Sequence, residues 1–374
     1  MRVLVVNAGS SSLKLRVLDD SDQVTGTADL PAPRGAADAG AVESTLASLG
    51  ETDAVGHRIV HGGTLFTAPV KIDDAVLDKL RALTDLAPLH QPKSLAAAEA
   101  VQRARPGLPA VACFDTAFHA TIPAAAATYA LPREWRHRWT LRRYGFHGLS
   151  HSYCSRRAAE LAGAAGDATL RIVTCHLGAG ASLAAVRGGA SVDTTMGFTP
   201  LEGLVMATRS GSVDPGLVLW LEEHAGMPPA ELAATLEHRS GLLGLAGTAD
   251  MREVVDRASA GEQDARLALD VYTHRLRAGI AAMAAALGGL DLLVFTGGVG
   301  ENSPAVRSEA AAGLGFLGVR LDPERNTARA GNGGAADREI SHADASVGSF
   351  VIAAREDIEI AAQVRAVLSS SGSG

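Results

Sequence analysis

Short apolar runs and helix-like stretches alternate along the chain. Residues 2–6 form an apolar run, and residues 13–18 alternate, with Leu13, Leu15 and Val17 on one side and Lys14 and Arg16 on the other. This pattern predicts two strands that the Gly/Ser-rich turn at residues 7–12 joins into a hairpin. Further strands are expected at residues 54–60, 110–114, 172–175, 182–186 and 292–295.

Helical periodicity marks the longer stretches between these strands. Helices are predicted at residues 73–86, 94–105, 264–287 and 355–368, and a further helix begins at Ser303-Pro304 with Ser303 as its N-cap. Residues 21–42 and 329–336 are rich in Gly, Ala and other small residues and are predicted to be loops. Because strands and helices are mixed throughout, the fold class is α/β.

The opening hairpin has a counterpart in the second half of the chain. Residues 7–13 and 176–182 share a polar residue after a strand, a glycine two residues later, small residues and a second strand. This is a weak internal repeat, and it indicates two structurally related halves. The chain of 374 residues is also too long for one ordinary core, so two domains are expected.

Composition limits the classes of protein that fit. A hydrophobic content of 47% with 20% charged residues describes a folded globular chain, and the net charge of −7 disfavours general binding to nucleic acid or anionic membranes. The three cysteines form no C-x-x-C pair, which favours a reducing compartment. No signal peptide or long apolar run is recognised, so we expect a cytoplasmic protein. Residues 369–374 are interpreted as a flexible end.

Three glycine-rich turns follow apolar strands, at residues 7–12, 176–180 and 296–300. Such turns expose backbone N–H groups and leave room for phosphate oxygens, so together they favour nucleotide binding. The P-loop pattern G-x-x-x-x-G-K-[ST] is absent, and no G-x-G-x-x-G follows the first strand. The first two turns lie between strands, which favours the phosphate hairpins of actin-like ATPases.

Two arginines and one aspartate are candidates for the chemistry. Arg58 and Arg209 lie beside glycine turns, and guanidinium groups suit carboxylates and transferring phosphoryl groups. The alternative for each is a structural salt bridge. Asp115 ends a strand and is a candidate magnesium ligand or base, with a helix N-cap as the alternative. His147 and His151 have the i, i+4 spacing of metal ligands, but without H-E-x-x-H a zinc site is disfavoured.

Several blocks together resemble the acetate kinase family of the acetate and sugar kinase/Hsp70/actin superfamily. The match runs from Met1 to about Arg365. The blocks are NAGSSSLK at 7–14, GHRIVHGG at 56–63, APLH at 87–90, FDTAFH at 114–119, RYGFHG at 143–148, HLG at 176–178, MGFTPLEG at 196–203, TRSG at 208–211 and FTGGVGEN at 295–302.

The resemblance implies a role for each matched residue. The catalytic residues would be Asp115, Arg58, Arg209, His147 and Asn7. An apolar pocket for the acyl group would consist of Val60, Leu89, Phe146 and Pro200, with Arg58 holding the substrate. Asn7 and Glu356 would bind the metal, with Asp357 as the rival of Glu356. The ATP-binding residues would be Lys14, Ser10, Ser12, His176, Gly178, Gly180, Asp250, Met251, Arg252, Gly297, Gly298, Gly300 and Asn302.

The chain departs from the family pattern at several positions. Ala179 stands where the family usually has Asn, Gln91 replaces Asn, Ala207 replaces Gly, and Ser212 replaces Asp. The block around Glu356 is poorly matched. These changes bear on nucleotide affinity and metal placement rather than on the class of reaction.

The resemblance implies two ribonuclease H-like domains of the actin-like ATPase type with an interdomain cleft. The expected N-terminal domain comprises residues 1–117 plus 358–374, and the C-terminal nucleotide-binding domain residues 118–357. The implied activity is reversible transfer of the ATP γ-phosphate to acetate, with Mg²⁺ or Mn²⁺, giving acetyl phosphate and ADP. A homodimer is also implied. The alternatives are a propionate or butyrate kinase of the same family and a non-catalytic actin-like nucleotide-binding protein.

Overall fold

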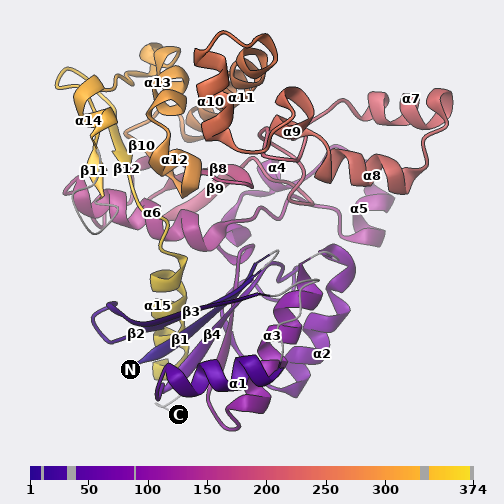
Figure 1. Ribbon diagram of the computed structural model, residues 1–374, viewed down its shortest axis with the longest axis vertical. Coiled ribbons are helices and arrows are strands. Elements are labelled where there is room, and N and C mark those ends of the chain that lie inside the picture. The colour runs from indigo at the N-terminus through magenta and orange to yellow at the C-terminus, as the bar shows by residue number, and fades with distance from the viewer. Residues whose placement is uncertain (10–11, 32–38, 88–89, 329–336, 371–374) are drawn as a thin grey trace. The chain divides into compact units, whose positions relative to one another are not determined.

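The computed structural model describes residues 1–9, 12–31, 39–87, 90–328 and 337–370, and the chain forms two compact units (Figure 1). Unit 1 comprises Met1–Ala120, Phe146–Tyr153 and Arg355–Gly374, and unit 2 comprises Thr121–Gly145 and Cys154–Ala354. Unit 1 therefore includes residues 118–120, 146–153 and 355–357, which the sequence-based boundaries had assigned to the second domain.

Unit 1 contains a mixed sheet of six strands. Their order is β3 (Val24–Pro31), β2 (Ser12–Leu18), β1 (Val3–Ala8), β4 (Ala54–Ile59), β6 (Ala110–Phe114) and β5 (Val70–Lys71). Strands β1, β4 and β6 are parallel neighbours, whereas β2, β3 and β5 run antiparallel to the strands beside them. The carboxyl ends of three parallel strands therefore meet along one edge.

Unit 2 contains a second six-stranded sheet of the same design. Its order is β11 (Arg338–Glu339), β12 (Gly348–Val351), β10 (Leu292–Thr296), β7 (Arg171–Leu177), β8 (Ala181–Arg187) and β9 (Ala190–Thr194). Here β7, β10 and β12 are parallel, β7–β8–β9 is an antiparallel run, and β11 is an antiparallel edge. The two sheets correspond strand for strand, so the internal repeat seen in the sequence is confirmed.

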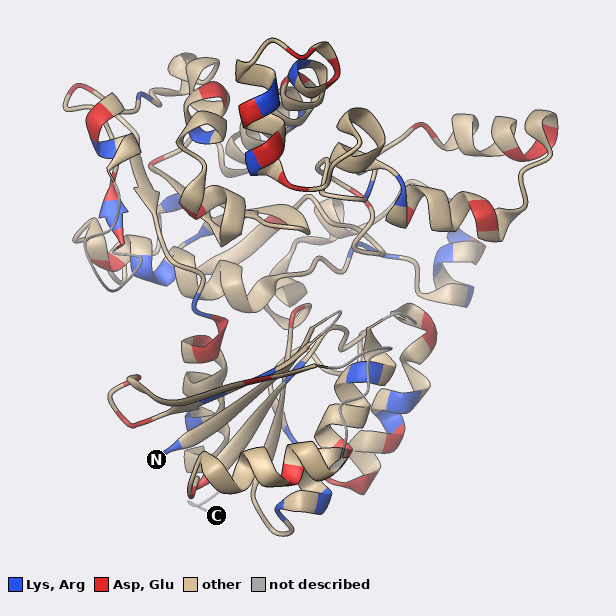
Figure 2. Cartoon of the chain, in the orientation of Figure 1, with Lys and Arg blue, Asp and Glu red and all other residues tan. Residues whose placement is uncertain are grey.

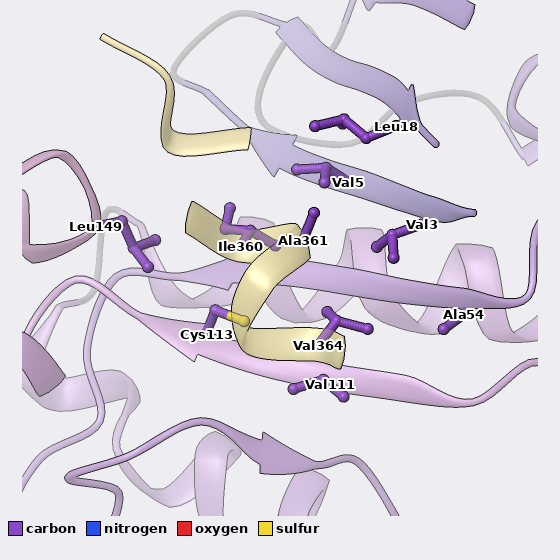
Figure 3. Close-up of a cluster of buried hydrophobic side chains, with 10 residues drawn as sticks. All are labelled: Val3, Val5, Leu18, Ala54, Val111, Cys113, Leu149, Ile360, Ala361 and Val364. Carbon is purple, nitrogen blue, oxygen red and sulfur yellow. The ribbon is translucent and has the colours of Figure 1, made fainter. Parts of the chain in front are cut away.

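Helices cover both faces of the first sheet, because successive apolar side chains of its central strand point to opposite faces. In β1, Val3 and Val5 pack with Ile360 and Val364 of α15 (Glu356–Ser370), the cluster drawn in Figure 3. The intervening residues of β1 pack on the opposite face with α1 (Ala39–Ser48) and α3 (Gln91–Ala104). A third cluster includes α2 (Asp74–Ala82), and short 3₁₀ turns occur at Thr84–Leu86 and Ala117–Thr121.

Unit 2 is richer in helices. The longest, α11 (Gln263–Leu287), packs against β7, β8 and β9. α6 (Gly148–Leu161) begins in unit 1 and ends in unit 2. The others are α4 (Ala124–Ala127), α5 (Arg133–Trp139), α7 (Pro215–Ala225), α8 (Pro229–His238), α9 (Gly241–Ala246), α10 (Met251–Ser259), α12 (Gly297–Asn302), α13 (Pro304–Ala312), α14 (Pro323–Thr327) and a 3₁₀ turn at Gly315–Leu317. Among the described residues, no helix combines the length and apolar character needed to cross a membrane.

Most predicted elements are confirmed to within a few residues, including Ser303 as the N-cap of α13. The loop prediction for residues 21–42 is wrong, because this region contains all of β3 and the start of α1. β3 is an edge strand of mostly small residues, so its side chains show no clear strand pattern. Its antiparallel hydrogen bonds to β2 stabilise it instead. The third glycine-rich turn is instead the short helix α12. Residues 329–336 lie outside the described residues.

Candidate active site

Three candidate side chains are carried to one edge of the first sheet by its parallel strands. Asn7 lies near the end of β1, Arg58 near the end of β4, and Asp115 directly after β6. The Asp115 N–H donates to the Ile59 carbonyl at 3.1 Å, which extends the β4–β6 ladder by one step. The backbone thus fixes where the Asp115 side chain begins.

The Arg58 guanidinium is the centre of this cluster. Its Nε and Nη2 donate to the two carboxylate oxygens of Asp115 at 3.0 and 2.6 Å, and Nη1 donates to Asn7 Oδ1 at 3.2 Å. Glu356, at the start of α15, lies 3.6 Å from Arg58 Nε and accepts a hydrogen bond from Asn7 Nδ2 at 3.4 Å. Residues far apart in the sequence therefore form one polar network, which we call the Arg58 cluster: Asn7, Arg58, Asp115 and Glu356.

Burial sets the electrostatics of the Arg58 cluster. The Asp115 side chain is 2% exposed, and those of Arg58 and Glu356 are 19% and 17% exposed. Burial opposes the charge on Arg58, but the Asp115 and Glu356 carboxylates outweigh it and raise the pKa of Arg58. Burial also disfavours the charged form of Glu356 and so raises its pKa. The charge of Arg58 opposes this shift, and that of Asp115 adds to it. One arginine thus faces two carboxyl groups within the cluster, and the nearby Lys14 is a further cation whose charge lowers the pKa of Glu356.

The contacts bear on two alternatives left open by the sequence. No backbone N–H of the described residues donates to the Asp115 carboxylate, because both of its oxygens face Arg58, so Asp115 does not act as a helix cap. At the start of α15, Asp357 pairs with Arg355 at 2.9 Å, whereas Glu356 reaches Asn7 and Arg58. Glu356 is therefore the acidic residue of this turn that belongs to the cluster.

The donor set of the cluster fits a small divalent cation. Two carboxylates and an amide oxygen are the hard oxygen ligands that Mg²⁺ and Mn²⁺ take, and the two carboxyl groups outnumber the one guanidinium of the cluster. Within the described ranges, no group of three or more His, Cys, Asp or Glu side chains is arranged to hold a metal. His147 and His151 have ring centroids 6.5 Å apart and belong to no such group.

His147 lies in a strained turn beside Asp115. Its φ of 56° is in the left-handed region, which is uncommon for a residue other than glycine. The next residue, Gly148, donates its N–H to the Asp115 carbonyl at 2.9 Å, and a Cβ there would lie 2.2 Å from that oxygen. The backbone of this turn therefore packs directly against the backbone of Asp115 within unit 1.

The residues expected to form the acyl pocket are divided between the two units. Val60 and Phe146 are buried in unit 1, where the Phe146 ring meets the His61 ring edge-on at 5.5 Å. Gln91, one of the departures from the family pattern, is buried and donates to the His61 carbonyl at 3.1 Å. Pro200 belongs to unit 2, and Leu89 lies outside the described residues.

The first hairpin, between β1 and β2, carries two of the residues expected to bind ATP, Ser12 and Lys14. Lys14 on β2 is opposite Asn7 in the β1–β2 register and is exposed. The Gly9 N–H donates to the Ser12 carbonyl at 2.8 Å and closes the turn. Ser10 falls outside the described part of the chain.

In unit 2, Arg209 is paired with a residue that the sequence reasoning did not name. Its Nε donates to Glu237 Oε1 of α8 at 3.0 Å, and both side chains are about one-fifth exposed, at 19% and 22%. Among the described residues, Nη1 and Nη2 of Arg209 have no hydrogen-bond partner. Nothing in the sequence around Glu237 marks this contact, which comes from the packing of the loop against α8.

The second hairpin differs in part from the expectation. His176 lies within β7, paired with Ser182, rather than in the turn itself. The Gly178 N–H donates to the Gly180 carbonyl at 2.9 Å. Ala207 donates its N–H to the Ala179 carbonyl at 3.2 Å, so two of the departures from the family pattern contact each other through their backbones.

A cavity of about 580 Å³ lies beside this hairpin in unit 2, a volume typical of small-molecule sites. Six of the expected ATP-binding residues line it: Gly178, Asp250, Met251, Arg252, Gly298 and Asn302. The lining also includes residues that were not expected, namely Ala179, Ala207, Leu242, Ala249, Tyr272, Val299 and Ser303. The lining does not include His176, Gly180, Gly297 or Gly300, and Ser12 and Lys14 belong to unit 1.

Two of the residues expected to bind ATP, Asp250 and Arg252, also bond each other at the start of α10. Asp250 is the N-cap of α10, where it accepts from the Arg252 N–H at 2.9 Å. The Arg252 side chain also bonds Asp250, and these bonds lower the pKa of Asp250 to about 2. The Arg252 side chain is nevertheless 83% exposed, and the residue lines the cavity.

Comparison with known proteins identifies relatives along nearly the whole chain. The model of the acetokinase family matches residues 31–362. An acetate kinase from Deinococcus deserti is 46% identical, covering 99% of this chain and 98% of the relative. An acetate kinase from Streptomyces coelicolor is 44% identical over 99% of this chain and 98% of its own length.

Solved structures of acetate and propionate kinases also resemble this chain. The acetate kinase of Porphyromonas gingivalis superposes with a TM-score of 0.89 at 36% identity, covering 98% of this chain and 99% of that one. A propionate kinase from Francisella tularensis has a TM-score of 0.89 at 35% identity, covering 97% and 98%. The expected two-domain α/β fold of the actin-like ATPase type is thereby confirmed. From the family match and these relatives, the chain belongs to the acetokinase family.

Proposed function

We propose that this chain is an acetate kinase, which reversibly transfers the γ-phosphoryl group of ATP to acetate and gives acetyl phosphate and ADP. The Arg58 cluster carries the proposal, because it combines a guanidinium that can bind a carboxylate with acidic groups that can bind a divalent cation. Family membership and the near full-length acetate kinase relatives support the same activity.

The chemistry asks for positioning and charge neutralisation rather than for a base. An acetate oxygen is already a nucleophile; it attacks the γ-phosphorus, the bond from that phosphorus to the bridging oxygen breaks, and ADP leaves. Asp115 is bound at both oxygens by Arg58, so its role in the proposal is to orient and balance that guanidinium. Arg58 would hold the acetate carboxylate, and Val60 and Phe146 its methyl group.

Asn7 and Glu356, with Asp115 beside them, would hold Mg²⁺ or Mn²⁺. When bound, the cation supplies positive charge that offsets the charge of the nucleotide phosphates. The raised pKa of Glu356 and the excess of carboxylates over arginines in the Arg58 cluster support this assignment.

Unit 2 supplies the nucleotide-binding groups in this proposal. The cavity lined by Met251, Arg252 and Gly298 would take the adenosine part of ATP. Arg209, whose Nη groups have no partner among the described residues, would stabilise charge that develops on the transferring phosphoryl oxygens. His147 would contact the same phosphoryl group.

The direct test measures ADP release in a coupled assay with Mg²⁺ and acetate, propionate, butyrate or no carboxylate. Acetate-dependent ADP release that is abolished by EDTA supports the proposal. ADP release from ATP without any carboxylate identifies an ATPase. A protein that binds ATP but releases no ADP under any of these conditions is a non-catalytic nucleotide-binding protein.

A propionate kinase is the second candidate, because the solved propionate kinase superposes as closely as the acetate kinase, each with a TM-score of 0.89. Within one fold, the two activities differ in how large an acyl group the pocket accepts. A higher kcat/KM for propionate than for acetate in the same assay would select this candidate.

We also propose that the protein is a homodimer that uses α7. None of the residues of this helix is buried, and Leu217, Leu219 and Trp220 are 48%, 56% and 53% exposed. Figure 2 shows α7 without charge along most of its length. Sedimentation equilibrium of the wild type and Trp220→Lys tests this; a monomeric wild type contradicts it. The three cysteines are all buried and none forms a disulfide within the described part of the chain, which suits the proposed cytoplasmic location.

A further inference from the structure

The short helix α12 forms part of the wall of the proposed nucleotide cavity, and one of its side chains bonds its own backbone. Gly298 and Asn302 both line the cavity, and Asn302 Nδ2 donates to the Gly298 carbonyl at 2.9 Å. The helix starts at Gly297, whose φ is 78° and where a Cβ would lie 2.8 Å from the Leu177 carbonyl oxygen. The start of α12 is therefore packed against the end of β7, next to the second hairpin.

One carboxylate of α12 connects the helix to a distant part of the chain. Oε1 of Glu301 accepts hydrogen bonds from the Gly297 N–H at 3.0 Å and from the Ala354 N–H at 2.9 Å. Gly297 is the first residue of α12, and Ala354 is the last residue of unit 2. Two residues after Ala354 comes Glu356, the acidic member of the Arg58 cluster.

A buried arginine, Arg307, binds the backbone of α12 at Glu301. Arg307 has no exposed surface, and its Nη1 donates to the Gly300 and Glu301 carbonyls at 2.7 and 2.9 Å. Its other nitrogens donate to Asn326, at 2.7 Å for Nε and 2.6 Å for Nη2. These carbonyls at the end of α12 accept from a cation, so the backbone that carries the Glu301 side chain has little freedom to shift.

A second carboxylate binds the same segment without touching α12. Asp337 Oδ1 accepts from the Ala353 N–H at 3.1 Å, and its Oδ2 accepts from Arg157 Nε at 2.7 Å. Consecutive N–H groups, those of Ala353 and Ala354, are thus bound by Asp337 and Glu301. Of these two carboxylates, only Glu301 also holds the start of α12, among the contacts of the described residues.

We propose that Glu301 is a positioning residue that connects the nucleotide cavity to the segment leading into Glu356. Its shared oxygen fixes α12 at Gly297 and fixes the chain at Ala354, so loss of the carboxylate alters nucleotide binding and cation binding together. The inference rests on the proposed function, because it takes the cavity as the nucleotide site and Glu356 as a cation ligand. It adds a residue that contacts neither ligand.

The test compares Glu301→Ala, Glu301→Gln and Asp337→Ala with the wild type. We measure the ADP dissociation constant by calorimetry without metal, the Mn²⁺ dissociation constant by electron paramagnetic resonance without nucleotide, and the melting temperature. For Glu301→Ala we expect both dissociation constants to rise by about 5- to 10-fold, the scale of one lost hydrogen bond. Glu301→Gln retains an acceptor oxygen at the same place and restores most of both affinities.

Asp337→Ala is the matched control. It removes the other carboxylate that binds the segment at Ala353 and Ala354, so we expect weaker Mn²⁺ binding with an unchanged ADP dissociation constant. Glu301→Ala that weakens only one ligand, or that lowers only the melting temperature, overturns the inference. Failure of the proposed function has a different result: wild-type protein that binds neither ADP nor Mn²⁺, or that shows no acetate-dependent ADP release.

Discussion

Arg58 and Asp115 form a two-point pair, in which guanidinium Nε and Nη2 meet the two carboxylate oxygens at 3.0 and 2.6 Å. The pair is buried on the aspartate side and partly open on the arginine side. Asp115 thereby fixes the orientation of Arg58, and part of the Arg58 side chain stays exposed, as its proposed role in holding acetate requires.

Asp115→Asn is expected to abolish acetate-dependent ADP release while the protein stays folded. Asparagine keeps the shape but has one acceptor oxygen and no charge, so Arg58 loses half of its two-point partner and is drawn toward Glu356. Circular dichroism and the coupled assay measure the two effects. An Asp115→Asn enzyme with wild-type kcat and wild-type Mg²⁺ dependence would show that Asp115 is structural.

Arg209→Ala is expected to lower kcat by about 10³-fold, with a much smaller change in ATP affinity. The reason is that guanidinium Nη groups without a protein partner can bind charge that develops in the transition state. Glu237→Gln is the control, since it weakens the partner of Arg209 but keeps the arginine. A kcat within a few fold of wild type for Arg209→Ala would assign the residue to the ion pair alone.

Cation affinity is expected to fall as the pH is lowered from neutral. Burial, with Asp115 adding to it, raises the pKa of Glu356 above its usual value of 4.5, against the opposing effect of Arg58. The cation binds the deprotonated carboxylate, so binding is complete above this raised pKa and is lost as the pH falls through it. Mn²⁺ titrations at several pH values measure the effect. A Glu356→Gln variant that retains the wild-type affinity and pH dependence would exclude Glu356 as a ligand.

Val60→Ala is expected to raise kcat/KM for propionate relative to acetate. Removing two methyl groups enlarges an apolar pocket, and one methylene in such a pocket is worth about 1–3 kcal/mol. The Phe146 ring is held against His61, so it is less free to fill the space. Kinetics with acetate, propionate and butyrate give the ratio. If the ratio is the same in both proteins, Val60 does not line the pocket.

Gly56→Ala is expected to destabilise unit 1 by about 1–3 kcal/mol through overpacking. A Cβ at this position of β4 would lie 2.4 Å from Ile360 Cγ2 and 2.7 Å from Val364 Cγ2, so α15 must move away from the sheet. Gly315→Ala is the control, because a Cβ there meets nothing within 4 Å. Urea unfolding compares the two variants, and equal midpoints would contradict the close packing of α15.

The sequence was informative where side-chain pattern and backbone geometry agree. The alternation at residues 13–18 predicts the inward face of β2, and Leu13, Leu15 and Val17 do share one cluster. Because β1, β4 and β6 are parallel, residues at their carboxyl ends meet, which brings Asn7, Arg58 and Asp115 together from three separate motifs.

Contacts made by tertiary packing could not be predicted in the same way. The partner of Arg209 is Glu237, which lies in an ordinary amphipathic helix with no motif of its own. Likewise β3 is stabilised by main-chain pairing with β2, which small polar side chains do not reveal. At the start of α15 the resemblance favoured Glu356 over its neighbour Asp357 in a poorly matched block, and the direction of each side chain now separates the two.

The matching strand orders of the two sheets have a consequence for how this molecule could have diversified. In unit 1 the residue after the third parallel strand is Asp115, whose N–H bonds the Ile59 carbonyl; in unit 2 the residue in the same place is Ile352, whose N–H bonds the Phe295 carbonyl at 3.0 Å. The ladder is identical, and an acid in one copy is an aliphatic residue in the other. In a scaffold built twice in this way, the backbone hydrogen bond at this position does not depend on which side chain stands there. The side chain can therefore change in one unit, toward a different ligand, while the fold of both units is kept.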